Sequence, residues 1–294
     1  MTSTDRRGRP AARAAWRRFW LGLLTVSGLA RRGFFIPHRY AATLPPAGAR
    51  PSYPAVEARL RAAEPAFREA IGWVEDCGAA LAAIGDGAPP APRWAQAWFA
   101  PLDAAVAYAL VRRRHPARIV EVGSGHSTRF LARAVADGAL SSRILAIDPA
   151  PRAALSGLPV TVRRTTVQAA GPAPFRELQA GDILFIDSSH ILMPGSDVDF
   201  LLGQILPALP AGVLLHLHDI FLPDDYPADW DWRGYNEQLG VLPMLLDPRW
   251  RPVFASHYAA TRMAEPVGRS LVGRLPRAAG ARDSSLWLER GEAA

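Results

Sequence analysis

Arg118-Ile-Val-Glu-Val-Gly-Ser-Gly-His-Ser-Thr-Arg129 reads as a short buried strand, a glycine turn and the start of a helix. The β-branched residues before Glu121 are typical of a parallel strand. Gly123 and Gly125 let the backbone turn without a Cβ and approach a ligand closely. The stretch therefore predicts a βα unit with a ligand at its turn.

The residues after the turn indicate what this ligand is. Ser127 and Thr128 can cap a helix predicted over 129–136, whose free N–H groups would face the ligand. The next predicted strand, 144–147, ends in Asp148. An acid about 20 residues after such a turn is placed to accept hydrogen bonds from the two hydroxyls of a ribose. We therefore expect a nucleoside site.

A dinucleotide or a triphosphate is a poor match for this site. Thr128 stands where a dinucleotide site needs a third glycine, and no Gly-Lys-Ser/Thr follows. Glu121 would repel phosphate but can accept from an ammonium group. Glu-x-Gly-Ser-Gly-x-Ser-Thr with Asp148 resembles the class I S-adenosylmethionine-dependent methyltransferases. The resemblance implies S-adenosylmethionine as cofactor, bound by Glu121, Gly123, Ser124, Gly125, Ser127 and Asp148.

The 294 residues suffice for one large domain with an accessory segment. All 34 basic residues are arginines, and with 27 acids they give a net charge of +7. This uniform arginine usage is also expected from coding bias, so the charge is weak evidence for nucleic acid. The single cysteine, Cys77, excludes internal disulfides and Cys-clustered metal sites. A reducing cytoplasm fits this composition.

Residues 1–53 read as a basic arm, a short apolar helix and a linker, with residues 1–15 disordered. The apolar run within 16–35 is too short to span a bilayer. On a helix, its aromatic residues would share one side. Two interpretations follow: a helix packed on its own domain or on a partner, or an interfacial helix that makes a peripheral contact with the inner membrane face.

Residues 54–92 read as an accessory long helix and a linker. Apolar residues recur over 54–84 at helical spacing and predict one helix that either covers the catalytic domain or pairs in a homodimer. A Gly- and Pro-rich segment, 85–92, ends it. Residues 93–294 then form the predicted methyltransferase domain.

Strands and helices alternate after the glycine turn. The expected fold is a doubly wound, mostly parallel seven-stranded sheet of the Rossmann-like methyltransferase type, with an N-terminal helical extension. Ligands of such sheets bind at the carboxyl ends of the strands. The predicted strands after the turn are 144–147, 160–163, 182–187, 212–219, 252–256 and 285–288, with helices over 102–113, 198–206 and 235–246.

Two of these strands end in polar residues, Asp187-Ser-Ser-His190 and His218-Asp219. They resemble the methyltransferase branch, like methyltransferase domain family 24, that has Phe-Ile-Asp-Gly-x-His and His-Asp-Ile at these points. Related metal-dependent O-methyltransferases hold a divalent ion there. The resemblance implies Asp187, His218 and Asp219 as ligands of Mg²⁺ or another divalent metal, although a histidine replaces an expected acid, and hard ions prefer oxygen.

The resemblance also implies the catalytic residues. His190 lies three residues after Asp187, where catechol-type enzymes carry a basic residue, and histidine titrates in the range of a general base. Asp187 and Asp219 would orient His190 or hold the ion. The structural alternatives are a turn cap for Asp187 and buried, hydrogen-bonded histidines at 190 and 218. His216 fits the core better than a ligand set.

The loop 221–237 is rich in aromatic residues and acids and stands where an acceptor would bind. Such a loop suits a small-molecule or sugar-like acceptor and makes nucleic acid unlikely. The sequence thus predicts an enzyme, an O-methyltransferase. Two alternatives remain: a non-catalytic scaffold or regulatory subunit that binds the donor, and a metal-dependent hydroxylase on the same fold that holds iron.

Overall fold

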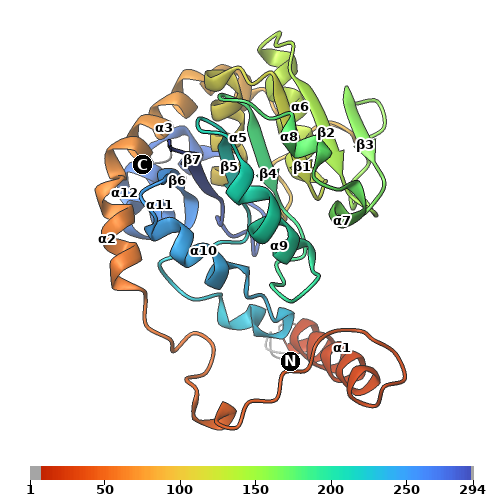
Figure 1. The fold of residues 1–294 in the computed structure, drawn as a ribbon. Helices are drawn as coiled ribbons and strands as arrows, with labels where there is room; N and C mark the ends of the chain where they lie inside the picture. Colours follow the sequence, from red (N-terminus) through yellow and green to blue (C-terminus); the bar gives the residue numbers. More distant parts are fainter. Residues whose placement is uncertain (1–7, 293–294) are drawn as a thin grey trace, which may run out of the picture. The chain divides into compact units, whose positions relative to one another are not determined.

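The computed structural model describes residues 8–292 and contains one seven-stranded sheet flanked by helices (Figure 1). The strand order is β3-β2-β1-β4-β5-β7-β6; β7 runs antiparallel to both of its neighbours, and the other pairs are parallel. This confirms the predicted doubly wound fold. The strands are β1 Arg118–Val122, β2 Arg143–Ile147, β3 Val160–Arg163, β4 Ile183–Ile186, β5 Leu214–Leu217, β6 Trp250–Ala255 and β7 Leu286–Arg290.

The helices fall before the sheet, between its strands and in the β5–β6 and β6–β7 connections. The α-helices are α1 Gly8–Val26, α2 Pro54–Ala62, α3 Glu64–Asp76, α4 Gly78–Ala82, α5 Pro101–Arg114, α6 His126–Asp137, α7 Val167–Ala170, α8 Ala173–Arg176, α9 Asp197–Phe200, α10 Glu237–Leu246, α11 Ser256–Arg262 and α12 Ala264–Arg269. Short turns of other helix types are η1 Ala41–Thr43, η2 Leu201–Ile205, η3 Leu206–Ala208, η4 Ala228–Arg233 and η5 Leu271–Arg274.

The chain forms two compact units. One contains the residues up to Pro51 together with Asp224–Tyr235, and the other contains Ser52–Pro223 and Asn236–Ala294, including the whole sheet. From Gly8 onward the predicted disordered arm is the helix α1, because its alanines and arginines favour helix; residues 1–7 lie outside the described part. No helix among residues 8–292 is both long and apolar enough to cross a bilayer.

The predicted single helix over 54–84 is wrong: three helices, α2 to α4, occupy this segment. Pro65 cannot donate a backbone hydrogen bond, so α2 ends before it and α3 starts with proline in its first turn. The apolar residues expected to face the domain or a second subunit are buried in the sheet's own core. These residues are therefore not free to pair two subunits, which was the basis of the homodimer prediction.

The register of the central strands positions the functional residues. Val122 of β1 pairs with Ile186 of β4, which pairs with Leu217 of β5. The residue that follows each of them therefore lies at the same carboxyl edge of the sheet. Gly123, Asp187 and His218 occupy these positions.

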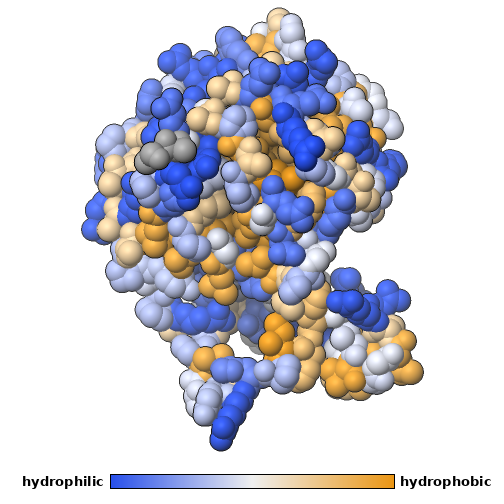
Figure 2. Space-filling model, viewed as in Figure 1, coloured by the Kyte–Doolittle hydropathy of each residue, from blue (hydrophilic) through white to orange (hydrophobic). Residues whose placement is uncertain are grey.

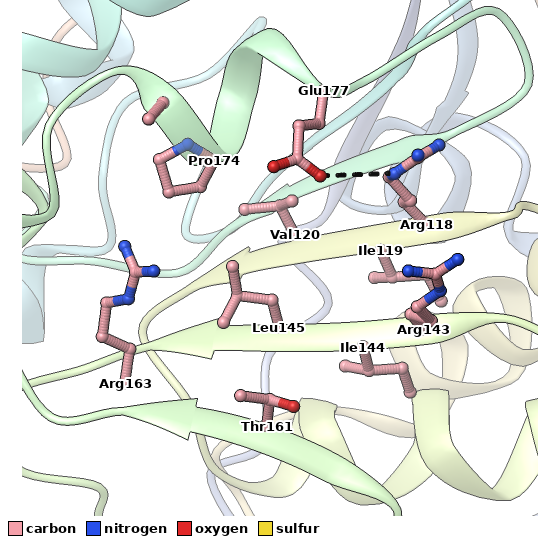
Figure 3. A pocket seen from close by; sticks show the side chains of 11 residues that line it. Arg118, Ile119, Val120, Arg143, Ile144, Leu145, Thr161, Arg163, Pro174 and Glu177 are labelled. Atoms are coloured by element: carbon pink, nitrogen blue, oxygen red, sulfur yellow. Dashed lines mark ion pairs between the residues drawn. The ribbon is translucent and has the colours of Figure 1, made fainter.

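The sheet leaves one surface of its β1–β3 half poorly covered. The β2–β3 connection has no helix, and the β3–β4 connection has only the four-residue helices α7 and α8. A cavity of about 290 Å³ lies there (Figure 3). Val120, Leu145 and Pro174 lie in its middle, and arginines stand at both ends. One of them, Arg118, pairs with Glu177 at 3.7 Å.

Gly123 is required by the close approach of two strands. Its φ is +84°, and a Cβ at this position would stand 1.8 Å from the backbone oxygen of Asp187. We expect Gly123→Ala to lower the free energy of unfolding by at least about 2 kcal/mol, because left-handed strain of roughly 1–2 kcal/mol adds to this clash. Urea denaturation measures the loss. Gly72→Ala on α3, where a Cβ meets nothing within 4 Å, is the control; equal stability of both variants would contradict the argument.

Candidate functional site

A cavity of about 430 Å³ opens at the carboxyl ends of β1, β2 and β4. Gly123, Ser124 and Asp148 line it, as predicted for the donor site. Asp148 is 8% exposed, and its two carboxylate oxygens accept from the Ser124 hydroxyl and the Ala150 amide, each at 2.7 Å. Each oxygen keeps a further acceptor position. The residues present therefore fit a ribose with two neighbouring hydroxyls.

The cavity has further polar lining that sequence reasoning missed. Two of these residues lie within the Asp187-Ser-Ser-His190 motif, where they were given no role. The others lie after β2, at or in the start of α7, or at the start of α9, where no motif distinguishes them. The full set is Arg152, Thr166, Gln168, Ser188, Ser189 and Asp197.

The predicted donor residues Glu121 and Ser127 lie behind the cavity rather than in its wall. The fully buried carboxylate of Glu121 accepts from the hydroxyls of Ser127 at 2.6 Å and Thr128 at 2.7 Å. Thr128 in turn accepts from the Gly125 amide at 2.9 Å. Helix α6 begins at His126, three residues earlier than predicted, so the two hydroxyl residues lie in its first turn. Glu121 thus ties the helix start to β1.

Burial raises the pKa of Glu121 to about 8, although the two hydroxyls that it accepts from oppose the rise. Because the folded pKa is raised, the folded state holds an extra proton, and stability falls as pH rises from about 4.5 to 8.

The melting temperature of the parent should fall between pH 5 and about pH 8.5. The melting temperature of Glu121→Gln, whose side chain stays neutral, should fall less over this range. Thermal unfolding across this range is the measurement. Glu69→Gln, on the exposed side of α3, should keep the parent's profile. An unchanged profile in Glu121→Gln would show that its carboxyl is ionised throughout.

Four side chains at the ends of β4 and β5 form a ring in which imidazoles and carboxylates alternate. The Nε2 of His190 lies 3.4 Å from both Asp187 and Asp219. The Nδ1 of His218 lies 3.5 Å from Asp187 and 3.4 Å from Asp219. We call these four residues the His–Asp ring. The structure thus brings together the side chains that the two strand-end motifs predicted.

Two buried acids from distant helices complete the surroundings of the ring. Glu237, the first residue of α10, lies 2.9 Å from the Nδ1 of His190. Asp103 of α5 lies 3.5 Å from the Nε2 of His218 and also accepts from the backbone amides of Ser284 and Ser285. Both acids are almost completely buried. Sequence reasoning missed them because each stands in the first turn of a helix, where acids are common.

The charges in this cluster compensate one another. Burial alone would lower the pKa of His190, but Asp219, Asp187 and Glu237 outweigh it and hold the pKa well above its usual value. Asp187 and Asp219 do the same for the pKa of His218. Burial raises the pKa of Asp187, and the two histidines more than reverse this, leaving it well below its usual value. The neighbouring carboxylates therefore favour the protonated form of both imidazoles.

The predicted metal ligands Asp187, His218 and Asp219 lie together, but their contacts do not favour an ion. Their carboxylate oxygens face imidazole nitrogens, whereas a hard divalent ion prefers a shell of oxygens. Within residues 8–292, no group of three or more His, Cys, Asp or Glu side chains is arranged to hold a metal. The metal prediction is not supported.

His216 belongs to the core. Its ring stacks on Phe185 with centroids 3.6 Å apart, and its Nε2 lies 2.8 Å from the Ser285 hydroxyl. Burial and the neighbouring His218 hold its pKa well below the usual value. The neutral ring packs beneath the His–Asp ring, as expected from its place on β5.

Residues 120–220 match the model of a family described as a methyltransferase domain. This central part of the chain is thus similar to a methyltransferase domain. The match spans both strand-end motifs, and the sheet order is the one expected for the class I S-adenosylmethionine-dependent type. No curated protein gives a significant match.

Solved structures of methyltransferases are similar to this chain at low identity. PaMTH1 from Podospora anserina, bound to S-adenosylhomocysteine, is 18% identical, with a TM-score of 0.40 over 64% of this chain and 78% of that one. An O-methyltransferase from Bacillus cereus is 16% identical, with a TM-score of 0.39 over 76% and 91%. TomG from Streptomyces achromogenes, an O-methyltransferase of tomaymycin synthesis, is 15% identical, with a TM-score of 0.40 over 76% and 90%.

Proposed function

We propose that this methyltransferase acts on a hydroxyl oxygen of a small-molecule or sugar-like acceptor, with His190 as the general base. One observation carries the proposal: Asp187 lines the donor cavity and also lies 3.4 Å from the Nε2 of His190. The donor cavity and the only buried imidazole–carboxylate ring found in residues 8–292 thus share a side chain. Methyl transfer to a hydroxyl needs this neighbourhood of an electrophile and a proton acceptor.

The hydrogen bond to Glu237 prepares His190 for this role. A carboxylate at Nδ1 keeps a proton on that nitrogen, so the neutral imidazole presents its lone pair at Nε2, toward Asp187. Bound S-adenosylmethionine supplies an electrophilic methyl group. The acceptor oxygen would receive this methyl group, and His190 takes the hydroxyl proton at Nε2. Asp187 and Asp219 stabilise the imidazolium that results.

The donor half of the proposal is tested at Asp148. Removal of a charged acceptor for two hydroxyls costs about 1.5 to 3 kcal/mol, so Asp148→Ala should bind S-adenosylmethionine at least about tenfold more weakly. Calorimetric titration measures the dissociation constant. Asp86→Ala, in an exposed loop, should bind like the parent. Equal affinity of Asp148→Ala and the parent for S-adenosylmethionine would contradict the proposal that Asp148 binds the donor.

The base is tested by turnover and its dependence on pH. His190→Gln should lose at least about a hundredfold in kcat. Because the neighbouring carboxylates raise the pKa of His190, the parent's rate should rise with pH above the range in which an ordinary histidine titrates. Glu237→Gln removes a negative charge at 2.9 Å, lowers the pKa and should shift this rise to lower pH.

The exposed His115→Gln is the control for the histidine variant. A His190→Gln rate within a few-fold of the parent would make His190 structural. Loss of turnover with a chelator, restored by magnesium or manganese, would instead favour metal activation of the hydroxyl through Asp187, His218 and Asp219. Product mass separates the rival activities, since methylation adds a CH₂ unit, hydroxylation adds an oxygen, and a scaffold leaves the acceptor unchanged.

A further inference from the structure

The charge of the protein is concentrated in its N-terminal segment. Residues 1–53 contain ten arginines and one acid, which gives a charge of +9. The remaining residues contain 24 arginines and 26 acids, which gives −2. No acid occurs between Asp5 and Glu57. The overall positive charge is therefore a property of this segment and not of the methyltransferase sheet.

Helix α1 in this segment exposes a continuous apolar side. Residues three and four positions apart share a side of a helix, and the exposed ones here are large and mostly aromatic. Figure 2 shows apolar surface on α1 beside hydrophilic surface. The exposed fractions are 61% for Trp16, 56% for Phe19, 46% for Trp20, 45% for Leu23 and 64% for Val26.

The chain after α1 continues this exposed apolar surface. Phe34, Phe35 and Ile36 are 48%, 67% and 65% exposed, and Arg31 and Arg32 stand directly before them. Exposed aromatic residues next to arginines, on a helix with no acid, are typical of a segment that lies in the interface of an anionic membrane.

The other side of α1 is held by the predicted acceptor loop. Arg18 pairs with Asp231 of η4 at 3.1 Å, and Leu21 and Leu24 are half-buried. Arg50, farther along the segment, pairs with Asp225 at 3.0 Å. Two acids of the loop, Asp225 and Asp231, thus bind the arm, and the aromatic side of α1 stays exposed.

The aromatic residues of the loop are also occupied. Trp230, Trp232 and Tyr235 surround the guanidinium of Arg233, with ring centroids 4.1, 5.4 and 5.3 Å from it. The interpretation of the loop as an aromatic platform for a sugar therefore loses support. The residues up to Pro51, which we call the arm, and Asp224–Tyr235 of the loop form one compact unit. We call it the arm–loop unit.

In the chain, this unit is followed directly by two residues that contact His190. The loop ends at Tyr235, and the next residues, Asn236 and Glu237, donate their backbone amides to the carbonyl of His190 at 3.1 and 3.2 Å. At its other end, Pro223 accepts from the Tyr53 amide at 2.8 Å. The chain thus passes from the arm–loop unit to the proposed base within two residues.

We propose that the arm–loop unit docks this enzyme on an anionic membrane surface and that the acceptor is a membrane-resident amphipathic molecule with its hydroxyl at the lipid–water interface. Charge complementarity and the exposed aromatic side of α1 identify the surface. The acceptor class follows from the chain connection: Tyr235 of the unit is followed directly by Asn236 and Glu237, which contact His190. This second part rests on the proposed function.

Vesicle flotation tests the docking surface with the full-length protein. It should bind vesicles of equal parts phosphatidylglycerol and phosphatidylcholine at low salt, and binding should weaken at least tenfold in high salt or on phosphatidylcholine alone. Phe19→Ala/Trp20→Ala should lose at least tenfold in binding. Leu246→Ala, which removes a 41% exposed apolar side chain from α10, should bind like the parent. Parent-like binding by the double variant, or none by the parent, would overturn the docking proposal.

The acceptor class is tested with methyl-labelled S-adenosylmethionine and the membrane and soluble fractions of the source cells. With the parent, label should enter a chloroform–methanol extract of the membranes. With Phe19→Ala/Trp20→Ala it should enter at least fivefold more slowly. The affinity of this variant for S-adenosylmethionine should equal the parent's. Label confined to water-soluble products would overturn the membrane acceptor and leave the methyltransferase proposal intact. If the parent does not bind S-adenosylmethionine, the proposed function itself is wrong, whatever the result with vesicles.

Discussion

The pairing of buried charges in the His–Asp ring is the constraint on which the functional half of this structure depends. Two imidazole rings lie between two carboxylates, and one further acid lies beside each ring. A buried ion that loses its partner is strongly destabilising, so none of these six side chains is independent of the others. Their chain positions, from Asp103 on α5 to Glu237 on α10, tie two helices to the ends of β4 and β5. The same pairing raises the basicity of His190, and the contact of Glu237 with Nδ1 leaves Nε2 as the nitrogen that exchanges a proton.

The sheet and the ring were predictable from sequence because each had a local signal. Runs such as Ile183–Ile186 mark buried parallel strands, and the polar residues after a strand must lie at its carboxyl end. Parallel strands bring such ends together, which places His190 near Asp219 without any knowledge of the loops between them. Glu237 and Asp103 had no such signal, because their partners are set by packing between helix and sheet.

Other differences have equally specific causes. The strand acid Glu121 was expected to face the ligand, but two hydroxyls in the first turn of α6 hold its carboxylate on the helix side. The helical spacing of apolar residues over 54–84 predicted one helix because Pro65 does not change that spacing. Pro65 nevertheless interrupts the backbone hydrogen bonds and separates α2 from α3. The role of the acceptor loop was predicted from its composition alone, and composition does not show which residues the loop's side chains contact. Its acids and aromatics bind arginines of its own compact unit.

The poorly covered surface of the β1–β3 half has a consequence for the motions of the sheet. The short α7 and α8 leave Leu145 half-buried and Thr161 exposed on this surface. Local opening is cheapest where few apolar contacts must be broken. Amide protons of β3 and the outer side of β2 should therefore exchange with solvent before those of β4 and β5. In such an opening Asp148, at the end of β2, would move with the outer strands while the His–Asp ring stayed in place, so the donor pocket would loosen from the ribose side.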